Sequence, residues 1–226
     1  MSLSQKLIDP HTRYLLLAGA VAGVQAIAVP LILALTRDGF SMARHANSQL
    51  VLGDWGWVQT ASFLVGGLLV IAFGVGIAKA LRGNAAGMTA AVCVMIYGLF
   101  GWVIVGLNPT DPMFGFPPGA RPDYPGYDEL STHAKIHGAA GSIGFLALMI
   151  ACLAFARYFQ AIGERGWALG SVAVALAIAG VGGYLAAYSG DEVAAFDYRP
   201  VWGGGFLLWL WLVTMACKLL RSGRAG

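Results

Sequence analysis

Charged residues are scarce in this chain: Asp, Glu, Lys and Arg make up 11% of its 226 residues, whereas about 25% is usual for a soluble domain. Hydrophobic residues make up 58%, and the mean hydropathy is +0.71. This composition excludes an ordinary soluble domain and predicts an integral membrane protein. The basic residues are scattered along the chain, so the pI near 8.8 does not indicate a nucleic-acid partner.

Two further scarcities limit the possible functions. The chain has three cysteines, Cys93, Cys152 and Cys217, all in apolar segments and without CxxC spacing. We therefore expect buried, inert thiols. The middles of the apolar segments lack acidic and basic residues, which disfavours an ion-coupled transporter, because such proteins carry polar groups at the membrane midplane.

Six apolar segments are long enough to cross a bilayer core of about 30 Å, which needs about 20 residues per helix. They cover residues 14–35, 55–80, 87–107, 132–158, 167–188 and 201–219, with ends approximate. Backbone polar groups in lipid must be satisfied internally, and the alternating pattern of a membrane barrel is absent from the sequence. The predicted fold is all-α: one domain, residues 1–226, forming a polytopic bundle of six transmembrane helices. Glycine clusters, such as Gly66-Gly67 and Gly180–Gly183, predict close helix packing.

Basic residues are distributed unequally between the two predicted sides of the membrane. Nine Lys and Arg residues lie on the side of the two termini, and five lie on the other side. This asymmetry predicts that both termini are cytoplasmic. The longer loops, 36–54, 108–131 and 189–200, would then be external. Residues 108–131 contain six prolines, which predicts an irregular cap rather than a helix.

A candidate metal centre lies at the start of the fourth predicted helix. His133 and His137 are four residues apart, so they share one helix face and could grip one ion. Asp111 or His45 could supply a third ligand. Zinc is the candidate ion, with a water of lowered pKa in the open position.

Catalytic candidates surround this centre in the external loops. Asp128, Glu129 or Asp191 could act as general base, and Ser48 could orient the substrate or the water.

Two other interpretations of the histidines remain open. They could simply cap and hydrate the start of the fourth helix, together with Ser131 and Lys135. They could also ligate a single haem. A haem pair across the membrane is excluded, because His11 lies beyond the other end of the first helix, about 33 Å from the external side.

Several separated motifs resemble the family called domain of unknown function 998. The first external loop and second helix contain R-x-x-x-S-x-L-x-x-G-x-x-G-W-x-Q, from Arg44 to Gln59. Asp111-Pro112 and a fourth helix that begins with His133, His137 and Gly138 follow in order. The resemblance implies a six-helix membrane protein of the bacterial or archaeal inner membrane, without an assigned activity. The residue types also resemble, more loosely, the alkaline ceramidase superfamily, although that group has seven helices and carries its paired histidines in the last one.

The leading functional hypothesis is non-enzymatic. In this hypothesis the bundle has a polar external site that binds or senses a lipid or a membrane protein partner. A second copy of the chain, forming a homo-oligomer, is a further candidate partner. The alternative is a metal-dependent hydrolase that acts on a lipid-like substrate at the outer leaflet. The second alternative is a single-haem membrane protein.

Overall fold

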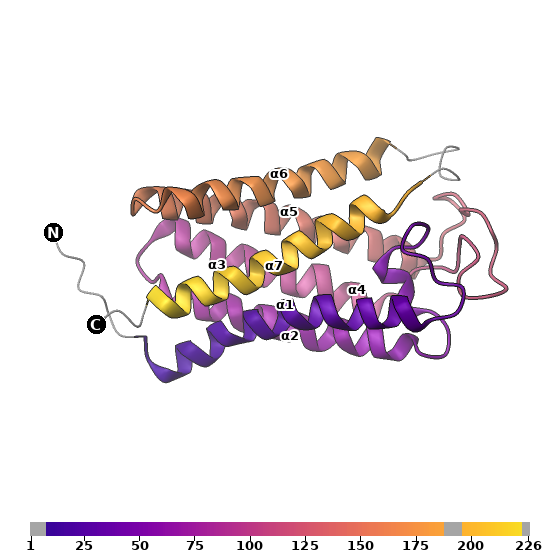
Figure 1. The fold of residues 1–226 in the computed structure, drawn as a ribbon, viewed down its shortest axis with the longest axis horizontal. Helices are drawn as coiled ribbons and strands as arrows, with labels where there is room; N and C mark the ends of the chain where they lie inside the picture. Colours follow the sequence, from indigo (N-terminus) through magenta and orange to yellow (C-terminus); the bar gives the residue numbers. More distant parts are fainter. Residues whose placement is uncertain (1–7, 188–195, 223–226) are drawn as a thin grey trace.

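The fold is a bundle of long helices, seen in a computed structural model that describes residues 8–187 and 196–222 (Figure 1). Within these ranges there is no strand, and six helical segments are long and apolar enough to cross a membrane. The predicted all-α, six-span class is confirmed. The spans are α1 (Pro10–Thr36), α2 (Gly56–Ala80), Ala85–Leu107, α5 (Thr132–Ala161), α6 (Arg165–Ala187) and α7 (Arg199–Ser222).

The third span contains three segments and a change of helix type. It consists of α3 (Ala85–Gly98), a π-helical turn η2 (Leu99–Ile104) and a last short turn α4 (Val105–Leu107). Such π-turns are rare and occur mostly as single turns within longer helices. A short 3-10 helix, η1 (Asn47–Val51), lies between α1 and α2.

Helix α1 begins at Pro10, four residues before the apolar run that predicts it. The side chain of Asp9 accepts hydrogen bonds from the Thr12 backbone N–H at 3.0 Å and from the Thr12 hydroxyl at 2.7 Å. Proline at the first helical position loses no hydrogen bond, because that N–H has no partner within the helix. The polar cap therefore extends the helix beyond its apolar part.

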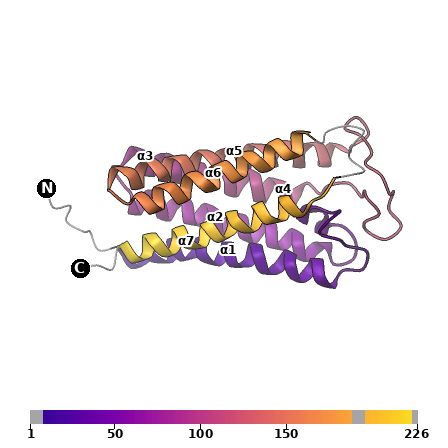
Figure 2. The same cartoon turned by 45° about the horizontal axis from the view of Figure 1, so that its top comes forward.

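The helices form a ring in which one neighbouring pair, α6 and α7, packs less closely than the others. Each span packs along its neighbours in the order α6, α5, α3, α2, α1, α7, while α6 and α7 contact each other much less. Figures 1 and 2 show the start of α1 and the end of α7 at the same end of the bundle, with the loops 37–55 and 108–131 at the opposite end. We call these two loops, together with residues 196–198, the cap.

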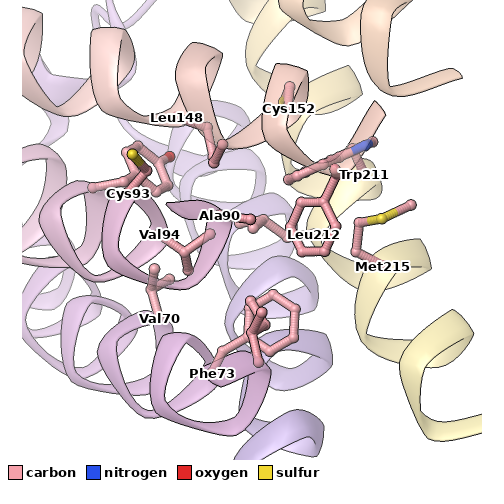
Figure 3. Close-up of a cluster of buried hydrophobic side chains, with 14 of the residues drawn as sticks. Val70, Phe73, Ala90, Cys93, Val94, Leu148, Cys152, Trp211, Leu212 and Met215 are labelled. Carbon is pink, nitrogen blue, oxygen red and sulfur yellow. The ribbon is translucent and has the colours of Figure 1, made fainter. Parts of the chain in front are cut away.

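Apolar side chains fill the interior of the ring (Figure 3). Val70 and Phe73 from α2, Val94 from α3, Leu148 from α5 and Leu212 from α7 are fully buried there. Moving an apolar side chain from lipid into the bundle changes its free energy little, because both environments are apolar. Close packing therefore has to hold such helices together. Gly101 and Gly144 show how close that packing is, because a Cβ atom on Gly144 would lie 2.6 Å from the Gly101 Cα atom.

Candidate functional site

The first turn of α5 is fixed by two side chains of the second cap loop. The hydroxyl of Ser131 accepts a hydrogen bond from the Ala134 N–H at 3.1 Å and so caps the helix. Asp111 Oδ2 accepts one from the Ser131 N–H at 2.7 Å. Asp111 therefore closes the base of this loop, across the twenty residues that separate it from Ser131.

His133 and His137 both bind Asn108, at the end of the third span. His133 Nδ1 lies 3.0 Å from the side-chain oxygen of Asn108, and His137 Nδ1 lies 2.8 Å from its backbone oxygen. The Asn108 amide group donates to the Ile104 carbonyl at 2.8 Å, which is consistent with its oxygen facing His133. Since both acceptors are oxygens, each ring donates from Nδ1, and Nε2 is the basic nitrogen of the neutral ring. Metal-binding histidines are commonly oriented in this way by an oxygen behind the ring.

His45 has a different environment and no free ring nitrogen. Its Nδ1 accepts from the Ser41 N–H at 2.9 Å, and its Nε2–H donates to the Phe114 carbonyl at 3.1 Å. The side chain is 2% exposed and packs against the rings of both Phe40 and Phe116. Burial lowers the pKa of His45, and the nearby Arg44 charge acts in the same direction, although the Phe114 bond opposes them. His45 is therefore a neutral link between the two cap loops, and the predicted ligand role has no nitrogen available to it.

Further hydrogen bonds tie the first cap loop to its neighbours. Gln49 accepts from the Ala46 N–H and donates to the Met113 carbonyl at 3.2 Å. Arg37 donates to the carbonyls of Leu50 and Leu52 and lies over the Phe116 ring. These bonds close the first loop over the second.

The same loop is also joined to α7. The indole N–H of Trp202 donates to the His45 carbonyl at 2.9 Å, and Tyr198 N–H donates to the Ala43 carbonyl at the same distance. Within the described part of the cap, no buried side-chain nitrogen or oxygen lacks a partner.

Two of the predicted catalytic carboxylates, Asp128 and Glu129, are exposed, and one of them is paired. Glu129 accepts from Arg121 at 2.9 Å, and Arg121 also pairs with Asp123. Asp128 holds Lys135 through its backbone oxygen at 3.2 Å. Asp191 lies outside the described residues.

Ser48 is half-buried in η1. The suggested task of orienting a substrate stays a prediction.

The four predicted metal ligands do not assemble into one centre. Among the described residues, no group of three or more His, Cys, Asp or Glu side chains is placed to hold a metal ion. Asp111 faces the Ser131 backbone and His45 joins the loops, so only His133 and His137 lie together, with both rings held by Asn108. Sequence reasoning missed Asn108, which organises this pair; its signal is a polar residue at the end of a span, directly before Pro109.

A groove between α6 and α7 is the second candidate site. It has two adjoining parts that share Trp167, with volumes of about 610 Å³ and about 310 Å³. The larger part lies at the Ser222 end of the bundle and contains the ion pair Lys218–Glu164, 2.7 Å long. The smaller part is almost entirely apolar.

Two polar atoms on residues that line the smaller part of the groove are buried without a partner. They are the Ser171 hydroxyl and the Trp211 indole nitrogen, on side chains 1% and 5% exposed. An unpaired donor in an apolar environment is costly, so these two positions favour a ligand that brings acceptors.

Comparison with known proteins gives one match. A family model described as "Protein of unknown function (DUF998)" matches residues 20–218. No curated protein and no solved structure matches the chain.

Proposed function

Because the chain belongs to the DUF998 family, whose function is unknown, we propose a role from the geometry: it is a non-enzymatic membrane protein that binds a lipid. The lipid's acyl chain lies in the groove between α6 and α7. The cap is a structural lid. This proposal keeps the lipid-binding hypothesis but moves the binding site from the cap to the opposite half of the bundle.

The observation that carries the proposal is the unfilled space between α6 and α7. Leu207 and Leu210 of α7 are 44% and 53% exposed along it, and α6 is the least buried of the six spans. Elsewhere in the ring, neighbouring helices pack along their lengths. A flexible acyl chain suits a narrow apolar groove whose walls do not close on each other.

The proposed environment is the inner membrane of a bacterium or archaeon, with Pro10 and Ser222 on the cytoplasmic side. The support is the accumulation of basic residues at that end of the bundle. They include Arg13, Lys79, Arg82, Arg157, Arg165, Lys218 and Arg221. A reporter fused after Gly226 should be cytoplasmic; an external reporter would overturn this orientation.

Lipid binding is tested by filling the groove. Gly170 lines it, and a Cβ atom there would meet no atom within 4 Å, so Gly170→Phe adds bulk without an internal clash. We expect native mass spectrometry of the full chain to show a retained lipid in the wild type and its loss in this variant. The matched control is Gly180→Phe, which is equally open on the same helix but away from the groove. Equal lipid retention in wild type and Gly170→Phe would contradict the proposal.

A metal-dependent hydrolase is the second candidate. It is favoured by the orientation of His133 and His137, whose Nδ1 atoms are both held by Asn108 oxygens. Metal analysis tests this second candidate. If the hydrolase is correct, stoichiometric zinc should bind the wild type and be lost in His133→Ala and His137→Ala, but not in His11→Ala. Absence of stoichiometric metal after zinc addition would remove the hydrolase. In the same preparation, a spectrum without a Soret band would remove the haem alternative.

A further inference from the structure

We infer that the lipid in the α6–α7 groove is anionic and that Arg221 and Lys218 hold its headgroup at the groove's end. This inference rests on the proposed lipid-binding function and adds the chemical class of the ligand. It follows from the charges at the end of the groove and from the depth of its two unpaired donors.

Among the charged side chains that line the groove, Glu164, Lys218 and Arg221, one positive charge is uncompensated. Lys218 donates to Glu164 at 2.7 Å and lies 5.5 Å from the centre of the Trp167 ring. Its side chain is 16% exposed, so this ammonium group is held in place. Arg221 also lines the groove and is exposed, and no carboxylate within the described ranges pairs with it. A phosphate group placed here would meet one fixed cation and one free guanidinium.

The unpaired donors lie at a common depth below these charges. Ser171 is seven residues from Glu164 along α6, and Trp211 is seven residues from Lys218 along α7. At about 1.5 Å per residue, both lie about 10 Å further into the bundle. Both offer a hydrogen atom towards an acceptor.

This order of groups matches the order of groups in a phospholipid. Cations come first, then hydrogen-bond donors, then the apolar walls formed by Val174, Leu207 and Leu210. A phospholipid presents a phosphate, then ester oxygens, then acyl chains. An uncharged apolar ligand would leave Arg221 and the buried donors without partners.

The side of the membrane agrees with an anionic headgroup. The end of the bundle that carries Arg221 is the basic one, which we place in the cytoplasmic leaflet. Anionic lipids in that leaflet attract basic residues near the surface by about 1 kcal/mol for each residue, which is about a fivefold change in affinity.

The experiment compares two lipids that differ in headgroup charge. Full-length protein in mild detergent receives equal amounts of phosphatidylglycerol and phosphatidylcholine, and native mass spectrometry measures which is retained. We expect the wild type to prefer phosphatidylglycerol, and Arg221→Gln to lower the preference about fivefold. The control is Arg82→Gln, an exposed basic residue at the same end that does not line the groove.

Each outcome has a distinct meaning. A headgroup ratio that is the same in wild type and Arg221→Gln overturns the anionic inference; if Gly170→Phe still removes the lipid, the proposed function stands. Lipid retention unaffected by Gly170→Phe overturns the proposed function itself. A lipid-free dimer that Gly170→Phe dissociates assigns the groove to a second copy of the chain and overturns both.

Discussion

The cap and the α6–α7 groove differ in whether their buried polar groups are hydrogen-bonded. In the cap, His45 and Gln49 are buried and their polar side-chain atoms have partners, and the buried indole of Trp202 in α7 donates to the cap at the His45 carbonyl. In the groove, Ser171 and Trp211 are buried without partners. A region whose polar groups satisfy one another is complete by itself, whereas unpaired donors beside an open groove leave hydrogen bonds for a ligand to make. Under the proposed function, the richest cluster of polar residues in the sequence stabilises the fold, and the ligand binds elsewhere.

The largest expected effect is the loss of His45 from the cap. His45→Ala leaves the Ser41 N–H and the Phe114 carbonyl unpaired and opens a space beside Phe40. We expect a loss of about 2–4 kcal/mol in the free energy of unfolding, measured by denaturant titration in detergent. Arg44→Ala, at the exposed neighbouring position, is the control and should change stability little. Equal stability of His45→Ala and wild type would contradict the prediction that His45 stabilises the fold by joining the cap loops.

A smaller effect should appear on acidification. The pKa of His45 is lowered in the folded protein, mainly by burial, whereas an unfolded histidine titrates near 6.5. Between these two pKa values the unfolded chain binds the extra proton, so stability is full above about pH 6.5 and decreases as the pH falls below it. As the pH is lowered, the melting temperature should therefore fall more steeply in wild type than in His45→Gln. The other titrating groups are the same in both proteins, so the difference between the two profiles reports His45. Parallel pH profiles would contradict this.

The smallest expected effects on stability come from replacing two serines, Ser62, which is hydrogen-bonded, and Ser171, which is not. Gln25 Nε2 donates to the Ser62 hydroxyl at 2.6 Å between α1 and α2, so Ser62→Ala should cost about 0.6 kcal/mol. Ser171→Ala removes an unpaired hydroxyl, and in delipidated protein we expect no loss of stability. Lipid retention should be lower in Ser171→Ala and unchanged in Ser62→Ala. Destabilisation of the delipidated protein by Ser171→Ala would show that the hydroxyl has a partner within the bundle.

The spans could be predicted from the sequence because the physical cause is local. Uninterrupted apolar runs determine where a helix can cross lipid, and only the polar extensions, such as Asp9 before α1, lie outside that rule. The spacing of His133 and His137 likewise predicts a common face, and both indeed meet Asn108.

The environments of the other candidate residues depend on contacts between distant segments. His45 in a cap loop and His133 at the start of α5 are the same residue type, but the rings of Phe40 and Phe116 bury only His45. The groove follows from how α6 lies against α7, and no local pattern in either helix reports that distance. The packing predicted for glycines holds for Gly66 and Gly67, which meet Trp102 and Val103, but Gly180 and Gly182 face open space.

The π-turn Leu99–Ile104 determines the direction in which Asn108 points. Such a turn is equivalent to an α-helix with one residue inserted, and each residue of an α-helix advances the chain by about 100° around its axis. Without the insertion, the last turn of the third span would be rotated by about that angle, and Asn108 would face away from α5. A single additional residue in the cap-side half of the third span therefore sets the direction of the amide that aligns both histidines.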